Sequence, residues 1–232
     1  MIFIYPHSSQ VYNTYGLMGN AGLLHRYGFT ELDNPYDIVN IDLELVLQWS
    51  SSLFSSRYSR ARLSLWRRLD YSGTVGENSE YFEISFNGEP EVELLILLYI
   101  MLLPEETYSE LDLRVSTEGW ALEKHIVLSK KENIALERGS EVCKSLLLTK
   151  GVRSALLRIA DIRESFYREA SIGDEIEALK VERERGGERE SYHSRGLRVS
   201  ERRILEKLRN YVSSFGHAQN GSGSVRRKLK RK

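Results

Sequence analysis

The sequence predicts a mainly α-helical protein with a small β component. Apolar residues recur at helical spacing through long stretches of residues 58–212, as is typical of amphipathic helices. Two short segments, 38–43 and 81–86, alternate with a period of two and favour strands. Segment 90–103 is apolar on nearly all sides, which predicts the central helix of a core.

The composition indicates a globular protein without a strong overall field. The 232 residues are 41% hydrophobic, enough to bury a core, and Lys+Arg and Asp+Glu both number 33. Cys143 is the only cysteine, which excludes an intramolecular disulfide and fits a reducing compartment. We expect it to be a buried structural thiol rather than a nucleophile. No secretory signal is visible, and the apolar run 94–103 is too short to span a bilayer, so we expect a soluble intracellular protein without a membrane partner.

The first element with chemical character is the stretch from Val11 to Phe29. Its start favours an extended segment that ends at Gly16. Asn20 can then cap a helix over residues 21–27, which Gly28 can end in a left-handed conformation. Tyr15 and Tyr27 lie at the two ends of this unit, so their phenols could converge beside Phe29. This spacing fits either core packing with satisfied hydroxyls or a small aromatic site.

The next elements alternate between helix and strand. A strand from Ile38 follows the turn at Asn34-Pro35, and the spacing becomes helical over 42–49. Segment 58–69 predicts a helix whose arginines form a solvated face or, alternatively, a surface for RNA or an acidic partner. Strand 81–86 ends at Asn87-Gly88, and Pro90 fits the first position of the core helix, which Pro104 stops. The arginines in and beside the predicted helix 58–69 are Arg57, Arg60, Arg62, Arg67 and Arg68.

The second half is predicted to be helical with interruptions. Segment 107–115 has no clear form, while 120–128 and 131–162 favour helices, the latter bent near Gly139 and Gly151. Ser171 or Asp174 can cap a helix to about residue 180. The charged, glycine-containing segment 181–190 predicts a mobile loop, and 194–212 predicts a last amphipathic helix.

The sequence ends in a glycine- and serine-rich linker and a basic tail, residues 216–232. A basic cluster of this kind can be read by nuclear import or bind nucleic acid, and it can also be a disordered, solubilising end. The basic residues are Arg226, Arg227, Lys228, Lys230, Arg231 and Lys232.

Three motifs near the start resemble a known family. They are N-T-Y-G at 13–16, N-A-x-L-L-x-R-Y-G-F at 20–29, and D-N-P-Y-D-I-V at 33–39. Together they are similar to the closing segment of SET-domain protein-lysine methyltransferases, in the subgroup of the Rubisco large-subunit and ribosomal-protein lysine methyltransferases. Looser matches follow at Arg163-Glu164 with Tyr167, at 173–179 and at 198–205. These resemble the helical substrate-binding domain of that subgroup.

The resemblance implies a division of the chain and a set of roles. Residues 1–9 match nothing in the family, 10–45 would be the end of a SET β-fold, and 46–215 would be the all-α substrate-binding domain, before the linker and tail. Tyr15 would be the catalytic tyrosine that orients the substrate amine. Tyr27 would line the S-adenosyl-L-methionine side and Phe29 would pack on the adenine. No metal is implied.

The resemblance also implies partners and a limit on activity. The partner would be a protein substrate, ribosomal, chloroplast or chromatin, methylated in the nucleus or cytoplasm, or in the chloroplast for a full-length parent. The Asn-His-Ser-type and Gly-x-Gly motifs that precede N-T-Y-G in the family do not occur here. We therefore expect a C-terminal portion of such an enzyme that is inactive alone.

Two other classes of function stay open from the residues. The helical part could be a non-catalytic module that binds a protein target, and the basic tail could anchor a scaffold to nucleic acid. His25 could act as a base, but its position between Leu24 and Arg26 favours a surface histidine. The sequence leaves the oligomeric state undetermined.

Overall fold

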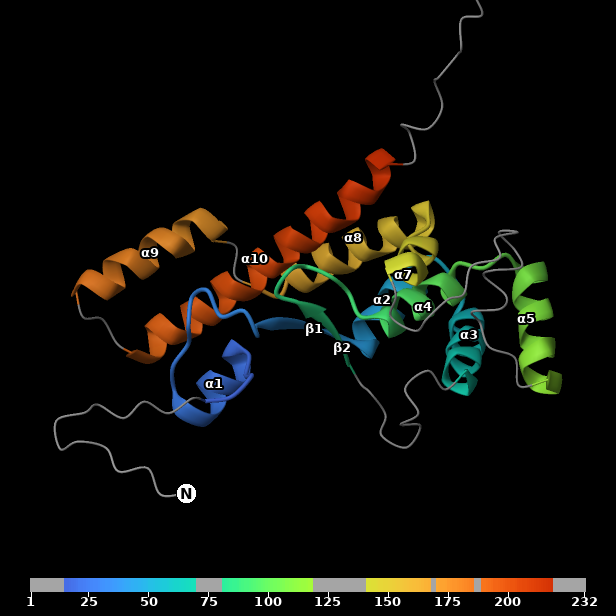
Figure 1. Cartoon of the computed structure of the whole chain (residues 1–232), viewed down its shortest axis with the longest axis horizontal. Coiled ribbons are helices and arrows are strands. Elements are labelled where there is room, and N and C mark those ends of the chain that lie inside the picture. The colour runs from blue at the N-terminus through green and yellow to red at the C-terminus, as the bar shows by residue number, and fades with distance from the viewer. Residues whose placement is uncertain (1–14, 70–80, 119–140, 168–169, 186–188, 219–232) are drawn as a thin grey trace, which may run out of the picture.

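The computed structural model describes residues 15–69, 81–118, 141–167, 170–185 and 189–218. The described part is mainly helical with one two-stranded antiparallel sheet, as the sequence predicts (Figure 1). The elements are α1 (Asn20–Tyr27), β1 (Ile38–Asp42), α2 (Leu43–Ser51), α3 (Ser56–Arg68), β2 (Tyr81–Ser85), α4 (Val92–Met101), α5 (Glu105–Glu118), α7 (Glu141–Leu147), α8 (Lys150–Glu164), α9 (Ile172–Arg185) and α10 (Arg189–Ala218).

The long helix α10 contacts more elements than its neighbours in sequence do. It runs diagonally through Figure 1, from beside α1 and α9 past α8, and contacts α8, α9, α1 and both strands. Helices α1 and α9 lie toward one end of it, while α3 and α5 lie at the far end of the molecule. The sequence predicts this last helix over residues 194–212. In the structure, α10 is longer: it begins at Arg189 and ends at Ala218.

Strands β1 and β2 pair antiparallel and bury one shared face. Val39 lies opposite Ile84 and Ile41 opposite Phe82, and all four side chains are at most 1% exposed. The strands lie on opposite sides of the domain boundary that the sequence suggested near residue 45. One hydrophobic core therefore continues across that boundary.

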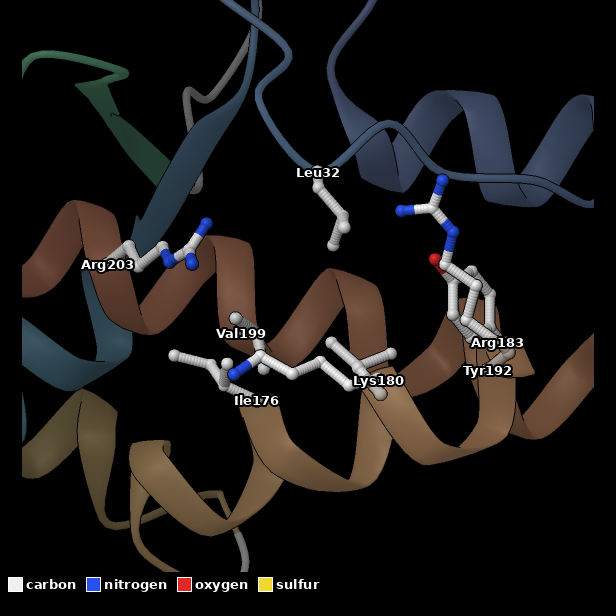
Figure 2. Close-up of a pocket in the computed structure, with 8 residues that line it drawn as sticks. Leu32, Ile176, Lys180, Arg183, Tyr192, Val199 and Arg203 are labelled. Atoms are coloured by element: carbon white, nitrogen blue, oxygen red, sulfur yellow. The ribbon is translucent and has the colours of Figure 1, made fainter. Parts of the chain in front are cut away.

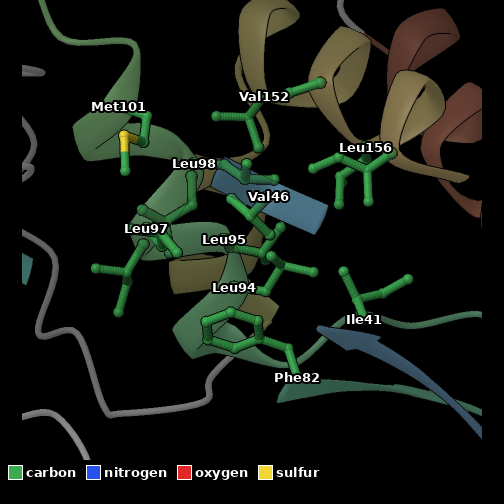
Figure 3. Packing of buried hydrophobic residues seen from close by; sticks show 14 of the residues in the cluster. Ile41, Val46, Phe82, Leu94, Leu95, Leu97, Leu98, Met101, Val152 and Leu156 are labelled. Carbon is green, nitrogen blue, oxygen red and sulfur yellow. The ribbon is translucent and has the colours of Figure 1, made fainter. Parts of the chain in front are cut away.

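The core is built around α4, as its all-apolar sequence predicts. Residues 94–98, 100 and 101 of this helix are all buried. Val46 of α2, Val152 and Leu156 of α8, and the sheet face surround it (Figure 3). Cys143 is buried at the edge of the same core, as expected for a structural thiol. In the part of the chain that the structure describes, no helix is long and apolar enough to cross a membrane.

The hairpin that follows β2 packs directly on α10. Gly88 has φ +83°, and its amide donates to the Ser85 carbonyl at 2.8 Å. A Cβ at this position would lie 2.4 Å from the backbone of both Lys207 and Leu208. Glycine is therefore needed for the turn, as predicted, and also for the close approach of two backbones, which the sequence did not reveal.

Several boundaries differ from the predictions. Pro90 lies before the helix, in a bridge with Ile84, because α4 begins only at Val92. Segment 107–115 is part of α5. The bend expected at Gly151 lies instead at Leu148-Thr149, where the Thr149 hydroxyl caps α8 by accepting from the Val152 amide at 3.3 Å. Residues 181–185 continue α9 as helix rather than forming a loop.

Arg62 departs from the predicted solvated face of α3. Its side chain is 1% exposed, and its guanidinium lies 3.5 Å from the centroid of the Tyr58 ring and 4.1 Å from that of Tyr108. It donates to the Leu103 carbonyl at 2.9 Å and to Glu105 at 3.1 Å. The charge is buried because aromatic faces and fixed oxygens replace its water.

Part of the predicted first strand, some of the predicted helical segments and the basic tail lie outside the described residues. They fall in 10–14, 120–128, 131–140 and 219–232.

Candidate functional site

The candidate site is an aromatic cluster at the two ends of α1. Tyr15 precedes this helix, Tyr27 is its last residue, and Phe29 follows its left-handed cap Gly28, with φ +74°. The centroid of the Tyr15 ring lies 4.7 Å from that of Tyr27 and 5.0 Å from that of Phe29. The short helix therefore brings the three aromatic rings together, as their spacing in the sequence suggested.

The cluster is not part of the hydrophobic core. The side chains of Tyr15 and Tyr27 are 51% and 50% exposed. Core packing, the alternative interpretation of their spacing, therefore does not account for these two residues. Their open faces can contact another molecule through the ring surfaces and can offer two phenol hydroxyls.

A buried polar network fixes α1 to the rest of the protein. Asn20 is fully buried, and its side chain both donates to and accepts from the Glu31 backbone, at 2.7 and 2.8 Å. Asp37 is 1% exposed. Its carboxylate accepts from the Asn20 backbone N–H at 2.9 Å and from the Asn20 side-chain amide at 2.8 Å. Ser200 of α10 also donates to Asp37. The network joins α1, the loop that leads into β1, and α10.

Asn20 therefore has a role other than the predicted helix cap. Gly19 occupies the cap position, without a side-chain hydrogen bond, and Asn20 is the first helical residue. Its amide group is turned inward to Glu31 and Asp37 instead. Asn20 and Asp37 both belong to the motifs that resemble the methyltransferase family, and the structure shows that they are each other's partners.

We predict that Asp37→Asn lowers the free energy of unfolding by about 2 kcal/mol. The carboxylate faces only donors, from Asn20, Ile38 and Ser200, so an amide group would turn its own donor toward one of them. Urea unfolding measures the change, and faster hydrogen exchange in α1 should accompany it. Asp33→Asn, at a side chain that is 90% exposed, is the control and should cost almost nothing. Equal costs at the two positions would contradict the role of the network.

The loop after Phe29 is seated on α10. The Thr30 amide donates to Nδ1 of His193 at 3.0 Å. Gly196, one turn along the helix, allows this contact because a Cβ there would lie 2.7 Å from the Thr30 hydroxyl. The residue that follows Phe29 is therefore held by α10, which is far away in the sequence.

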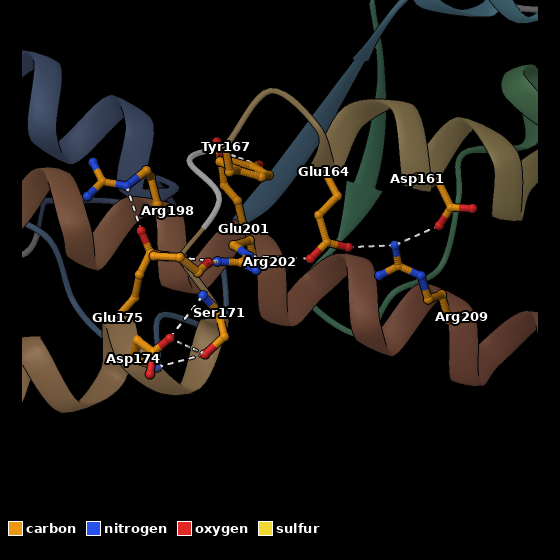
Figure 4. Close-up of polar contacts among 11 residues, drawn as sticks. Asp161, Glu164, Tyr167, Ser171, Asp174, Glu175, Arg198, Glu201, Arg202 and Arg209 are labelled. Carbon is orange, nitrogen blue, oxygen red and sulfur yellow. Dashed lines mark hydrogen bonds and ion pairs between the residues drawn. The ribbon is translucent and has the colours of Figure 1, made fainter.

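An ion-pair network joins α8, α9 and α10 (Figure 4). Glu175, with a side chain that is 1% exposed, accepts from Arg198 at 3.1 Å and from Arg202 at 3.2 Å. Arg202 also pairs with Glu164 at 3.3 Å. These residues come from the three downstream segments that resemble the substrate-binding domain, so the structure gives those matches a common physical role. The predicted cap of α9 is present as well, since the Ser171 hydroxyl accepts from the Asp174 amide at 3.1 Å.

Glu201 and Arg163 form a second set of contacts, which joins α8 and α10 to β1. Glu201 accepts from the Tyr167 hydroxyl at 2.6 Å and from Arg163 at 3.1 Å, and Arg163 also donates to the Asn40 carbonyl at 3.2 Å. Burial raises the pKa of Glu201, against the opposing effects of the Tyr167 hydrogen bond and the Arg163 charge. Burial, together with the Glu201 charge, also raises the pKa of Tyr167. Tyr167 is therefore a neutral donor that positions Glu201.

A groove opens between α9, α10 and Leu32 (Figure 2). Its floor is aliphatic, from Leu32, Ile176, Leu179 and Val199, and Tyr192 closes one side. Lys180, Arg183 and Arg203 line its rim, and the cavity volume is about 170 Å³. Sequence reasoning did not find this groove, because its lining comes from three segments whose apolar residues look like ordinary core positions.

The remaining candidates give no further site. His25 is exposed on α1, as expected for a surface histidine. Within the described ranges, no group of three or more His, Cys, Asp or Glu side chains is arranged to hold a metal ion.

Comparisons with known proteins point to one class of enzyme. No family model matches the chain. The chain is 31% identical over 108 residues to N-lysine methyltransferase SETD6 of Bos taurus, which is 44% of this chain and 24% of the relative. It is 30% identical over 111 residues to the Homo sapiens protein of that name and 28% over 114 residues to the Xenopus laevis one, or 23% and 24% of their lengths. The match thus spans about a quarter of each of these relatives.

Proposed function

We propose that this chain is part of a SET-type protein-lysine N-methyltransferase. Tyr15, Tyr27 and Phe29 would form one wall of its methyl-transfer site, and the helical body would bind the protein substrate. The observation that carries the proposal is the half-exposed ring cluster, together with the similarity to three N-lysine methyltransferases. The sequence motifs support the subgroup of the Rubisco and ribosomal-protein enzymes. They also support the proposed boundary at about residue 45, between the end of the SET domain and the helical substrate-binding domain.

The cluster suits S-adenosyl-L-methionine as a partial site. That cofactor supplies a methyl group bound to a sulfonium, and aromatic faces attract such cations. Tyr27 and Phe29, whose ring centroids are 6.4 Å apart, would hold its cationic and adenine ends. The open faces of Tyr15 and Tyr27 leave the far wall of the site to other residues.

Tyr15 would act on the amine of the substrate. Its hydroxyl can accept a hydrogen bond from the neutral amine and orient the nitrogen lone pair toward the methyl group. A phenol carries no full charge, so it does not favour the ammonium form that cannot attack. Because methyl transfer requires a site that excludes water, and these rings are half exposed, we expect the chain alone to be inactive.

The substrate would be a protein of ribosomes, chloroplasts or chromatin. The nucleus or cytoplasm is the proposed compartment, and the chloroplast is the alternative for the full-length parent. The basic tail could add contacts with nucleic acid, but it lies outside the described residues.

We predict that Tyr15→Phe strongly slows methyl transfer in a complete enzyme. A chimera in which this chain replaces the matching quarter of the Bos taurus relative should transfer labelled methyl groups from S-adenosyl-L-methionine to protein lysines. Tyr15→Phe should reduce kcat by about 100-fold, because it removes the hydroxyl that orients the substrate amine. Tyr36→Phe, at another exposed tyrosine between α1 and β1, is the matched control and should keep activity.

The outcomes separate the two classes of function. Normal turnover in the Tyr15→Phe chimera would exclude the proposed role of Tyr15. A folded chimera without cofactor binding in calorimetric titration would favour the other candidate, a non-catalytic module that binds a protein target. The cationic groove of Figure 2 is the observation that supports that alternative.

A further inference from the structure

We propose that the groove between α9, α10 and Leu32 binds an acidic protein segment, anchored by one apolar side chain. The groove shares no lining residue with the aromatic cluster, and no proposed step of methyl transfer uses it. The proposal does not require the enzyme function. In a methyltransferase it would select substrates at a point away from the target lysine.

The floor of the groove suits a single aliphatic or aromatic anchor. Leu32, Ile176, Leu179 and Val199 present methyl groups to the cavity. Leu179 and Val199 are only 5% and 1% exposed, so this part of the floor is recessed below the surface. An apolar side chain that entered would exchange water for these contacts, the usual source of affinity at the centre of an interface.

The size of the groove excludes larger ligands. Its volume of about 170 Å³ lies below the roughly 300–1,000 Å³ typical of sites for cofactors and drug-sized molecules. One side chain of a bound segment would fill it. The rest of that segment would lie along the rim.

The rim carries the charges that such a segment would meet. Arg203 and Arg183 stand at opposite ends of the groove, with Lys180 between them on α9 (Figure 2). Carboxylates on both sides of an apolar anchor would face these cations. Rim charges of this kind give specificity and fast association rather than high affinity.

Two of the cations already hold carboxylates that a ligand could replace. Arg203 lies 3.7 Å from Asp33, whose side chain is 90% exposed, and Lys180 lies 3.3 Å from Glu177, whose side chain is 68% exposed. Exposed pairs at these distances are weak. The internal carboxylates show the kind of group that the rim accepts, and they compete with a ligand for it.

A membrane surface fits the groove less well than a protein segment. Insertion into a bilayer needs apolar side chains that project outward, whereas the apolar residues here are recessed behind charged ones. An extended peptide can lower one side chain into a narrow groove. It can also keep its carboxylates at the rim.

The test uses the intact chain and a fluorescein-labelled peptide with the sequence Gly-Glu-Glu-Leu-Glu-Glu-Gly. Fluorescence anisotropy should show saturable binding with Kd in the range of about 10 to 300 μM. The Leu→Ser peptide and the peptide with Gln in place of every Glu should each bind at least about fivefold more weakly. Raising NaCl from low to high concentration should weaken the parent peptide as well.

Variants of the chain locate the site. Lys180→Glu with Arg183→Glu should weaken binding about tenfold, and Ile176→Trp should do the same by filling the groove. Asp33→Asn should strengthen binding about two- to threefold, because it removes the carboxylate that competes for Arg203. Arg57→Glu, an exposed charge reversal on the distant α3, is the control and should change nothing. Circular dichroism verifies that each variant is folded.

Each contrary result overturns the proposal. Absence of binding up to about 1 mM would overturn it. Equal binding of the Gln peptide would also overturn it, because the rim charges would then have no role. An equal loss of binding in Arg57→Glu would indicate general charge attraction. Binding of phosphatidylserine vesicles that is lost in Lys180→Glu with Arg183→Glu, without peptide binding, would assign the groove to membranes instead. None of these results depends on methyl transfer, so the two proposals can fail separately.

Discussion

Gly88→Ala is expected to lower the free energy of unfolding by about 2 to 5 kcal/mol, a large share of the stability of a domain of this size. Two costs combine at this position. The backbone has φ +83°, where an L-residue is strained by about 1–2 kcal/mol. The new Cβ would also lie 2.4 Å from backbone atoms of Lys207 and Leu208, and a helix backbone cannot move aside as a side chain can. Overpacking of this kind costs about 1–3 kcal/mol.

Gly28→Ala separates the two costs. Its φ is +74°, almost the same as that of Gly88, but no atom lies within 4 Å of the Cβ position. Only the conformational cost of about 1–2 kcal/mol should remain. Urea unfolding followed by circular dichroism gives both values. If the two substitutions cost the same, the contact between the hairpin and α10 is not as tight as the structure indicates.

Glu175→Gln is expected to cost about 3–5 kcal/mol, the largest effect predicted for a single polar residue here. The Glu175 carboxylate lies between the guanidinium groups of Arg198 and Arg202 at 3.1 and 3.2 Å, with only 1% of its side chain exposed. Removing its charge leaves two cations facing each other, of which Arg202 is 10% exposed and cannot turn to water. Glu164 compensates only part of this loss.

Glu177→Gln is the matched control for this prediction. It lies on the same helix, pairs with Lys180 at 3.3 Å, and its side chain is 68% exposed. Solvent screens such a pair, so the change should be within about 0.5 kcal/mol of zero. The comparison is made by denaturant unfolding of both variants under one buffer condition. A small effect at Glu175 would mean that α9 does not depend on the buried pair for its position on α10.

The ion-pair network and the buried Asn20–Asp37 pair both affect the surfaces proposed to function. Helix α9 carries Ile176, Lys180 and Arg183 of the groove, and Glu175 holds the start of that helix against α10. Asn20 and Asp37 hold α1, which carries the aromatic cluster. Loss of either network should therefore weaken ligand binding at its own surface before the whole chain unfolds.

The sequence by itself determined the elements whose signals are local. The all-apolar helix α4, the amphipathic α3 and α8, the two short strands, the left-handed Gly28 and the turn at Asn87-Gly88 all follow from spacing and turn chemistry within a few residues. The convergence of Tyr15, Tyr27 and Phe29 was also predictable, because one short helix separates them. The catalytic and cofactor roles proposed for these residues come from the family resemblance.

Only the tertiary structure decided the roles of the polar residues and of the surfaces. Asn20 pairs with Ser200, 180 positions away, and Arg62 with Glu105, so neither partner could be identified from neighbouring residues. A polar side chain near a helix start favours a cap or a solvated face when it is considered locally. Packing of distant helices buried these side chains, and a buried polar group must find a partner wherever the fold places one. The same packing left two tyrosines half exposed and brought α9, α10 and Leu32 together around the groove.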